Sequence, residues 1–411
     1  MQADLYQKLE PALQAAKNSV HEITQIKEAP LAVLGSPPTP GVFAFDKYSS
    51  ITLLLDALGQ DVGDAGTDLR KRRLMVLPRA PVRRLVRKDD AVVALELAIE
   101  GRALPLKLKP KCAIVLANGT IEATRLALTD LGVGDRTSGQ PRVGNLMAHM
   151  RSNIFVRVKR DALKLGPLSK TKSEVAALMV RGEALNRRFH LQTVAAARSG
   201  WPESVIWSMV PDIDLLDKLI ADQDPVWISI VFRGIGEMED DRRMVDGAAK
   251  TWRNWIELKP NPGKDGLRKA NVMLNPSSND RALWKIMDRA ALDLAEKLAP
   301  KGDVQYWNEQ IKDWQDDRLN LDAEKKPWRD GIGTTFHEGG TLFMGSPAAE
   351  TGTRSITDEN GKFHTLANVY VASPATFPTL GSANPSLTAL SLARHTADAI
   401  LGLHGIKSPV G

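Results

Sequence analysis

The chain has 411 residues, which is long enough for two or three domains with a sizeable core, and its single cysteine, Cys112, excludes an internal disulfide framework. Its hydrophobic fraction of 43% and charged fraction of 25% are ordinary for a globular protein, and no apolar run is long enough to predict a membrane span. The net charge is +6, but the basic runs at 70–73 and 83–84 contain no interleaved aromatic residues, which favours a solvated face over nucleic-acid binding. A lone cysteine and an N-terminus without a secretory signal pattern predict a cytoplasmic protein.

Helical and then strand-forming patterns fill the first part of the chain. The leucine spacing predicts an amphipathic helix over 1–22, a loop rich in proline and glycine follows over 23–45, and a second helix begins within 50–57. Strands are predicted at 73–77, 82–87, 92–97 and 111–117. The last of these is a short apolar run typical of a strand buried on both faces, and a helical pattern over 121–128 follows it.

The middle of the chain changes character, and all nine tryptophans lie between Trp201 and Trp328. Alternating stretches at 153–159, 190–194 and 227–233 predict strands with one wet face. Two further strands, 252–258 and 269–274, flank a turn at 261–266 and predict a hairpin, and a long helix is predicted over 279–298. These patterns predict a mixed sheet-and-helix domain inserted between the first region and the C-terminal segment.

The C-terminal segment again shows a buried-strand pattern followed by a helical pattern, as the first region does. Residues 369–372 have a buried-strand pattern, and 387–400 carry a helical apolar stripe. Asn384 suits the N-cap of that helix, and Pro385 suits its first helical position. The free backbone N–H groups and the dipole of such a helix start can hold an anion or a negatively charged cofactor, although an ordinary capped helix accounts for the pattern equally well.

A histidine in a glycine-rich loop is the main candidate for chemistry. His337 has six glycines nearby, at positions 331, 333, 339, 340, 345 and 352. Glycine lets backbone approach a ligand closely, and a histidine there can act as a general base near neutral pH. A purely structural histidine remains the alternative for this motif taken alone. The motif is not a zinc-protease site, because Thr341 stands where the second histidine would be.

The segments 333–345 and 377–388, in this order and spacing, resemble the C-terminal signature of the glucose-methanol-choline (GMC) flavin oxidoreductases. The strand-turn-helix stretch 113–128 resembles another segment of that family. So does 143–149, although Ala148 stands where the family usually has an aspartate. The resemblance covers about 70–150 and 330–402 well and the middle of the chain only in outline.

The resemblance implies an α+β or α/β fold, consisting of an incomplete FAD-binding domain of the GMC type with an inserted mixed-sheet substrate-binding domain. The implied boundaries are 1–150 for the partial FAD-binding domain, 151–330 for the substrate-binding domain, and 331–411 for the part that returns to the FAD-binding domain. Three Gly-x-Gly pairs, at 132/134, 234/236 and 331/333, all lack the third glycine of a dinucleotide-binding fingerprint. The family's N-terminal dinucleotide-binding unit is therefore expected to be missing.

The activity implied by the resemblance is FAD-dependent oxidation of a CH–OH group in a small alcohol or sugar. In that chemistry His337 takes the hydroxyl proton and Asn384 orients the substrate oxygen. The residues carried over as cofactor contacts are Val82, Ala117, Gly119, Glu122, Ala372, Ser373, Pro385 and Thr388. The alternative is a truncated homologue, or one subunit of a split enzyme, that is inactive and does not bind FAD without a partner chain that supplies the dinucleotide-binding unit.

Overall fold

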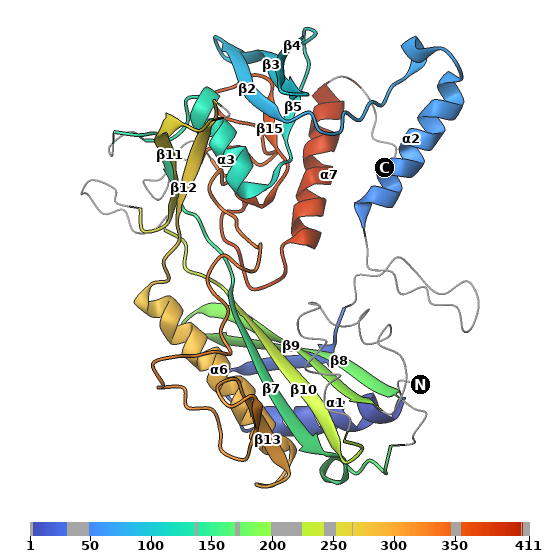
Figure 1. Ribbon diagram of the computed structural model, residues 1–411, viewed down its shortest axis with the longest axis vertical. Helices are drawn as coiled ribbons and strands as arrows, with labels where there is room; N and C mark the ends of the chain where they lie inside the picture. The colour runs from blue at the N-terminus through green and yellow to red at the C-terminus, as the bar shows by residue number, and fades with distance from the viewer. Residues whose placement is uncertain are drawn as a thin grey trace.

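A computed structural model describes residues 3–30, 49–135, 139–168, 173–198, 224–241, 252–264, 266–346, 355–403 and 405. These residues form one seven-stranded sheet, two three-stranded sheets and one two-stranded sheet, together with helices. In Figure 1 the seven-stranded sheet and the helices α1 and α6 form the lower part of the molecule, and the smaller sheets gather around α3 in the upper part. This mixed α and β composition confirms the predicted fold class.

The seven-stranded sheet is antiparallel throughout. Its strands, in spatial order, are β1 (Ile23–Glu28), β8 (Ser173–Ala184), β9 (Arg187–Arg198), β10 (Trp227–Gly236), β7 (Met150–Lys159), β13 (Val304–Asn308) and β14 (Asp313–Gln315). Because side chains alternate between the two faces of a strand, each strand gives one set of residues to the core and the other set to the opposite face.

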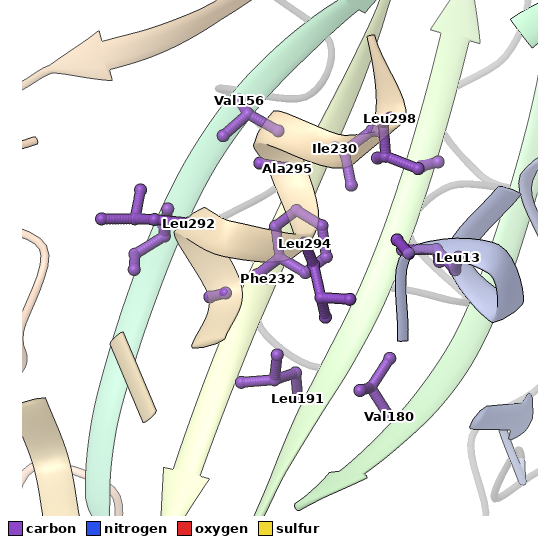
Figure 2. Packing of buried hydrophobic residues seen from close by; sticks show 14 of the residues in the cluster. Leu13, Val156, Val180, Leu191, Ile230, Phe232, Leu292, Leu294, Ala295 and Leu298 are labelled. Atoms are coloured by element: carbon purple, nitrogen blue, oxygen red, sulfur yellow. The ribbon is translucent and has the colours of Figure 1, made fainter. Parts of the chain in front are cut away.

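Two helices, α1 (Ala3–Lys17) and α6 (Ser278–Leu298), cover one face of this sheet and bury its apolar side chains. Figure 2 shows this packing, in which Leu294 and Leu298 of α6, Ile230 and Phe232 of β10 and Leu13 of α1 belong to one buried cluster. A capping box between Ser277 and Asp280 begins α6, since each satisfies a backbone N–H group of the other.

The opposite face of the sheet carries a smaller apolar cluster that includes Val194 and Val231, with polar side chains next to it. On β9, Leu191 lies in the helix-covered core, so its neighbours His190 and Gln192 lie on the other face. On β10, Phe232 lies in the same core, and Arg233 therefore faces the other way. These polar side chains are the part of the large sheet that reaches the candidate site.

The upper part is built around α3 (Gly119–Asp130). Its strands are β2 (Val82–Lys88), β3 (Ala91–Ile99) and β4 (Arg102–Lys107) in one sheet, β5 (Ile114–Leu116) parallel to β15 (Val369–Val371) in a second, and β6 (Arg142–Gly144), β11 (Trp255–Pro262) and β12 (Arg268–Met273) in a third. In Figure 1 helix α7 (Ser386–Leu403) lies beside these sheets, whereas α2 (Ser50–Ala65) stands apart from them at the right. The short 3-10 turns are η1 (Leu69–Lys71), η2 (Arg160–Leu163) and η3 (Pro374–Thr376).

The N-terminal helix packs against a different part of the molecule from the one predicted from its position in the chain. The sequence predicts the first helix as part of the 1–150 unit, but Leu5, Leu9 and Leu13 are buried in the core of the seven-stranded sheet. Residues 23–28, predicted as part of a loop, form β1 and pair with β8. The reason is that the leucine stripe of α1 meets its apolar partners on that sheet. The rest of the predicted loop, at 31–45, lies outside the described residues.

Local predictions were confirmed where periodicity was strong. The strands at 82–87 and 92–97, the hairpin β11–β12 and the helix α6 are present. The strand predicted at 73–77 was wrong, because these residues are unpaired and Met75 is 75% exposed. Within β5, Val115 is 43% exposed, so this strand is not buried on both faces.

Candidate active site

The His337 loop is held between two other segments of the chain. Met147 and Gly339 exchange two backbone hydrogen bonds, with both N–O distances at 3.0 Å. On the other side, the Gly340 N–H donates to the Pro374 carbonyl at 3.1 Å. Directly after His337 the loop is therefore anchored by backbone hydrogen bonds to two different segments, which limits the movement of the histidine.

Gly340 allows this close approach. Its φ angle is +95°, and a Cβ at this position would lie 2.5 Å from the Asn145 carbonyl oxygen and 2.3 Å from the Met147 Cε. The Asn145 side chain in turn donates from Nδ2 to the Gly340 carbonyl at 3.0 Å. Any side chain here would strain the backbone and push these groups apart.

His337 meets a second histidine. The Nδ1 atoms of His149 and His337 are 2.9 Å apart, and the two rings are nearly perpendicular, at 89°. The Nε2 of His149 lies 2.9 Å from the Gly381 carbonyl oxygen. His149 is fully buried, whereas His337 is partly exposed. Three segments far apart in sequence thus meet at this pair.

Polar side chains of β9, in the large sheet, complete the cluster. Gln192 donates from Nε2 to the Asn384 Oδ1 at 3.1 Å, and the neighbouring His190 is 4% exposed. Asn384 lies in the same segment as Gly381, and its side chain is hydrogen-bonded to β9 of the large sheet. The structure brings His337 and Asn384 into one cluster through His149, Gly381 and Gln192, and not by a direct hydrogen bond between them.

All three imidazoles are held in the neutral form at neutral pH. Burial, followed by the positive charges of Arg233 and Arg151, lowers the pKa of His337 to about 4. Burial also lowers the pKa of His149 to about 3 and that of His190 to about 4. A neutral imidazole is the form that accepts a proton, and a negative charge arriving beside His337 would raise its pKa and strengthen it as a base.

A pocket of about 930 Å³ lies between β2, β5, α3 and β12. Three of the predicted cofactor contacts, Val82, Ala117 and Glu122, line it. Its wall also includes apolar side chains such as Ile114 and Leu126. An apolar pocket with a carboxylate at its edge suits a flat ring that carries hydroxyl groups nearby.

Helix α3 connects this pocket to the histidine loop. Its Thr120 hydroxyl donates to the Glu338 carbonyl at 2.6 Å. One turn later, the hydroxyls of Thr124 and Thr341 are 2.7 Å apart. The helix that lines the pocket with Glu122 thus also positions the residue next to His337.

The remaining predicted cofactor contacts lie at element ends around this region. Gly119 begins α3 with a φ angle of +75° and does not line the pocket. Ala372 follows β15 and donates its N–H to the Leu116 carbonyl at 3.0 Å, and the adjacent Ser373 is the N-cap of η3. Pairing of β15 with β5 therefore holds both residues near one wall of the pocket.

The start of α7 differs slightly from its prediction. The helix begins at Ser386, and the Pro385 carbonyl accepts from the Ala389 N–H at 2.8 Å. Pro385 therefore takes the capping position that was expected for Asn384, whose side-chain oxygen accepts from β9 instead. Thr388 lies exposed in the first turn of this helix.

Two histidines of the cluster were not among the predicted site residues. His149 ends the stretch 143–149, which contributed to the resemblance but was assigned no role, and His190 lies on a predicted strand. The alternation along that strand was a usable signal, because it places His190 and Gln192 on one face. The contact of His149 with His337 had no local signal.

No metal site is indicated in the ranges that the structure describes, since they contain no group of three or more His, Cys, Asp or Glu residues suited to a metal ion. Nor does any helix of these same ranges combine the length and apolar character needed to cross a bilayer.

Comparison with solved structures shows which proteins share this fold. The fold is shared with pyridoxine 4-oxidase from Mesorbium loti at 15% identity and a TM-score of 0.51, covering 95% of this chain and 69% of that one. It is also shared with formate oxidase at 16% identity and a TM-score of 0.51, covering 82% of this chain and 62% of that one. A variant of the Aspergillus oryzae RIB40 formate oxidase, studied for its FAD modification, matches over the same shares at 15% identity and a TM-score of 0.52.

A comparison of the sequence with protein families finds a match in the C-terminal part of the chain. Residues 251–393 match the family model described as GMC oxidoreductase, and this segment contains both His337 and Asn384. This segment of the chain is therefore similar to the GMC oxidoreductases. No curated protein sequence matches it.

Proposed function

We propose that this protein takes part in the FAD-dependent oxidation of a CH–OH group in a small alcohol or sugar, with His337 as the base and Asn384 as the group that orients the substrate oxygen. One observation carries this proposal: His337 lies in a neutral, polar cluster that α3 connects to the pocket lined by Val82, Ala117 and Glu122.

The pocket residues fit the adenosine end of FAD. Apolar side chains on β5 and α3 can sandwich an adenine ring, and the Glu122 carboxylate can accept hydrogen bonds from ribose hydroxyls. The first turn of α7, which follows Pro385 and contains Thr388, offers backbone N–H groups and a positive dipole end to the flavin ring. FAD, when bound, supplies the acceptor for a hydride from the substrate carbon.

The residues of the cluster perform the proton transfer. His337 is neutral and partly exposed, so it can accept the hydroxyl proton of an alcohol. The Asn384 side chain, held by Gln192, keeps its amide in place to hydrogen-bond the same substrate oxygen. Arg233 and Arg151 act on His337 with positive charge, which favours the alkoxide character that develops as the proton leaves.

The visible absorption spectrum of the purified protein, with and without added FAD, tests cofactor binding. A yellow, protein-associated flavin band is expected. A preparation that stays colourless after addition of FAD and removal of excess would overturn the FAD-dependent proposal for this chain alone.

A pocket-filling variant tests the place of binding. Ala117→Trp puts an indole into the pocket and is expected to weaken FAD binding by at least about tenfold, because the adenine and the indole compete for the same volume. Ala103→Trp is the matched control, since Ala103 is exposed on β4 and does not line the pocket. Equal FAD affinity of the two variants, measured by fluorescence titration, would place the cofactor elsewhere.

The role of His337 is tested in a flavin-loaded sample. His337→Ala is expected to slow alcohol-driven bleaching of the flavin by about 100-fold or more, because general-base catalysis contributes factors of this size. Bleaching at an unchanged rate would remove His337 from the mechanism.

A second proposal is that the chain needs a partner chain to bind FAD and is inactive without it. The edge of the two-stranded sheet favours this, because β5 pairs only with β15 in the described part of the chain and its Val115 is 43% exposed. The FAD titration separates the two proposals, since this one expects no flavin to be retained by the isolated chain.

A further inference from the structure

His149 makes hydrogen bonds to His337 and to the Gly381 carbonyl, and the direction of each can be worked out from the chemistry of its atoms. The Gly381 carbonyl oxygen can only accept a hydrogen bond. The Nε2 of His149, 2.9 Å away, must therefore carry the proton and donate it.

The proton on Nε2 decides the role of the other ring nitrogen. A neutral imidazole has one N–H group, so the Nδ1 of His149 is an acceptor. His149 is fully buried, and burial favours the neutral form by lowering its pKa to about 3. The Nδ1 of His337, 2.9 Å from this acceptor, must then be the donor.

We propose that His149 is a positioning residue that holds His337 in the tautomer with its proton on Nδ1, so that Nε2 of His337 is the proton-accepting atom. His337 Nδ1–H donates to His149 Nδ1, and His149 Nε2–H donates to the Gly381 carbonyl oxygen. The significance of this tautomer for catalysis rests on the proposed role of His337 as the base, whereas the tautomer itself does not.

The arrangement also suits the charged form that a base must adopt. When His337 gains a proton on Nε2, its Nδ1–H still donates to the neutral His149, and that hydrogen bond becomes charge-assisted. No hydrogen bond has to break or reverse. A proton on the Nδ1 of His149 would instead face the N–H of His337, which explains why a buried, neutral acceptor is needed there.

The charged groups around the pair offer no competing acceptor. Among the described residues, the charges that act on the pKa values of His149 and His337 come from His190, Arg151, Arg233 and from each other. None of these groups is a carboxylate, the two arginines have no acceptor atom, and His149 Nδ1 is the ring nitrogen within 2.9 Å of His337 Nδ1. The acceptor lone pair of His149 is thus the partner for that proton.

Nitrogen NMR of the full-length, ¹⁵N-labelled protein at pH 7.5 tests the tautomers directly and needs neither flavin nor substrate. Long-range ¹H–¹⁵N spectra are expected to show His337 protonated on Nδ1 and His149 protonated on Nε2. The two rings are assigned from the signals lost in the variants below and in His337→Gln. Protonation of His337 on Nε2, or averaging between its two nitrogens, would overturn the proposal.

Two substitutions of His149 separate positioning from packing. His149→Leu removes the acceptor and is expected to shift the ratio of Nδ1–H to Nε2–H in His337 by about tenfold toward Nε2–H, the size of one hydrogen bond. His149→Gln can still accept from His337 and donate to Gly381, so the wild-type tautomer is expected to be retained. An unchanged ratio in the leucine variant would overturn the proposal.

His395→Leu is the matched control, because His395 is exposed on α7 and should leave the His337 signals unaltered. If the leucine variant does not fold, the tautomers of the wild type and of His149→Gln still decide the question. Since no readout depends on FAD, failure of flavin binding would contradict the proposed function and leave the tautomer result standing.

Discussion

His149, His190 and His337 share one environment of burial and positive charge, which makes the protein sensitive to acid. Their folded-state pKa values, about 3, 4 and 4, lie below the ordinary histidine value of 6.5. Unfolded chains therefore bind more protons below pH 6.5, so stability is fully present above pH 6.5 and is lost as pH falls toward the folded-state pKa values of about 4 and 3. For the two most buried rings, His149 and His190, the loss by pH 5.5 is about 1.4 kcal/mol each.

Urea unfolding at pH 7.5 and 5.5 measures this loss. His149→Gln and His190→Gln are each expected to flatten the pH dependence, whereas the exposed His395→Gln should leave it unchanged. Equal slopes for all four proteins would contradict the pKa values.

A second prediction at this scale concerns Gly340. Gly340→Ala combines a φ angle of +95° with a Cβ only 2.5 Å from the Asn145 carbonyl, which is backbone and cannot move aside easily. A loss of about 2–4 kcal/mol is expected. Gly266→Ala is the matched control, because its φ angle is +77° with nothing within 4 Å of the new Cβ, and about 1 kcal/mol is expected. Equal changes in the unfolding midpoints of the two variants would show that the loop accommodates the added methyl group at position 340.

At the scale of elements, Asp288 joins α6 to the seven-stranded sheet. Its carboxylate, fully buried, accepts from Ser152 of β7 at 2.5 Å, from the Trp328 indole at 2.9 Å and from Arg329 at 2.7 Å. Asp288→Ala leaves these donors without an acceptor and is expected to cost about 3–5 kcal/mol. Asp322→Ala, which breaks an exposed ion pair to Lys285 of the same helix, should cost less than about 1 kcal/mol. Chemical denaturation compares them, and similar losses would contradict a structural role for the buried network.

At the scale of the whole molecule, local stability is expected to be uneven. Helices α1 and α2 have 15 and 16 residues, but α1 buries its leucines, whereas Ile51, Leu53 and Leu55 of α2 are about 60% exposed. Amide hydrogens of α2 should exchange orders of magnitude faster than those of α1, because little packing opposes its opening. Hydrogen exchange read by mass spectrometry measures this, and comparable protection of both helices would mean that α2 is packed in solution.

Strong local patterns made much of the fold predictable. The capping box and apolar stripe of α6, the hairpin β11–β12 and the alternation along β9 and β10 each depend on neighbouring residues, and each is present. The His337 loop could also be recognised, because its glycines and the Asn384–Pro385 pair lie close together in the chain. The strand predicted at 73–77 failed, since an apolar run alone does not supply a pairing partner.

Local order thus came from the sequence, because helix and strand periodicity are properties of neighbouring residues. What only the tertiary structure decided was which distant segments meet: the packing of α1 on the seven-stranded sheet, and the contact of His149 with His337 across 188 residues. Such contacts depend on which apolar faces and backbone edges find each other, and no local pattern encodes that choice. The direction of the His337 hydrogen bond, and with it the atom available to accept a proton, follows from that distant contact.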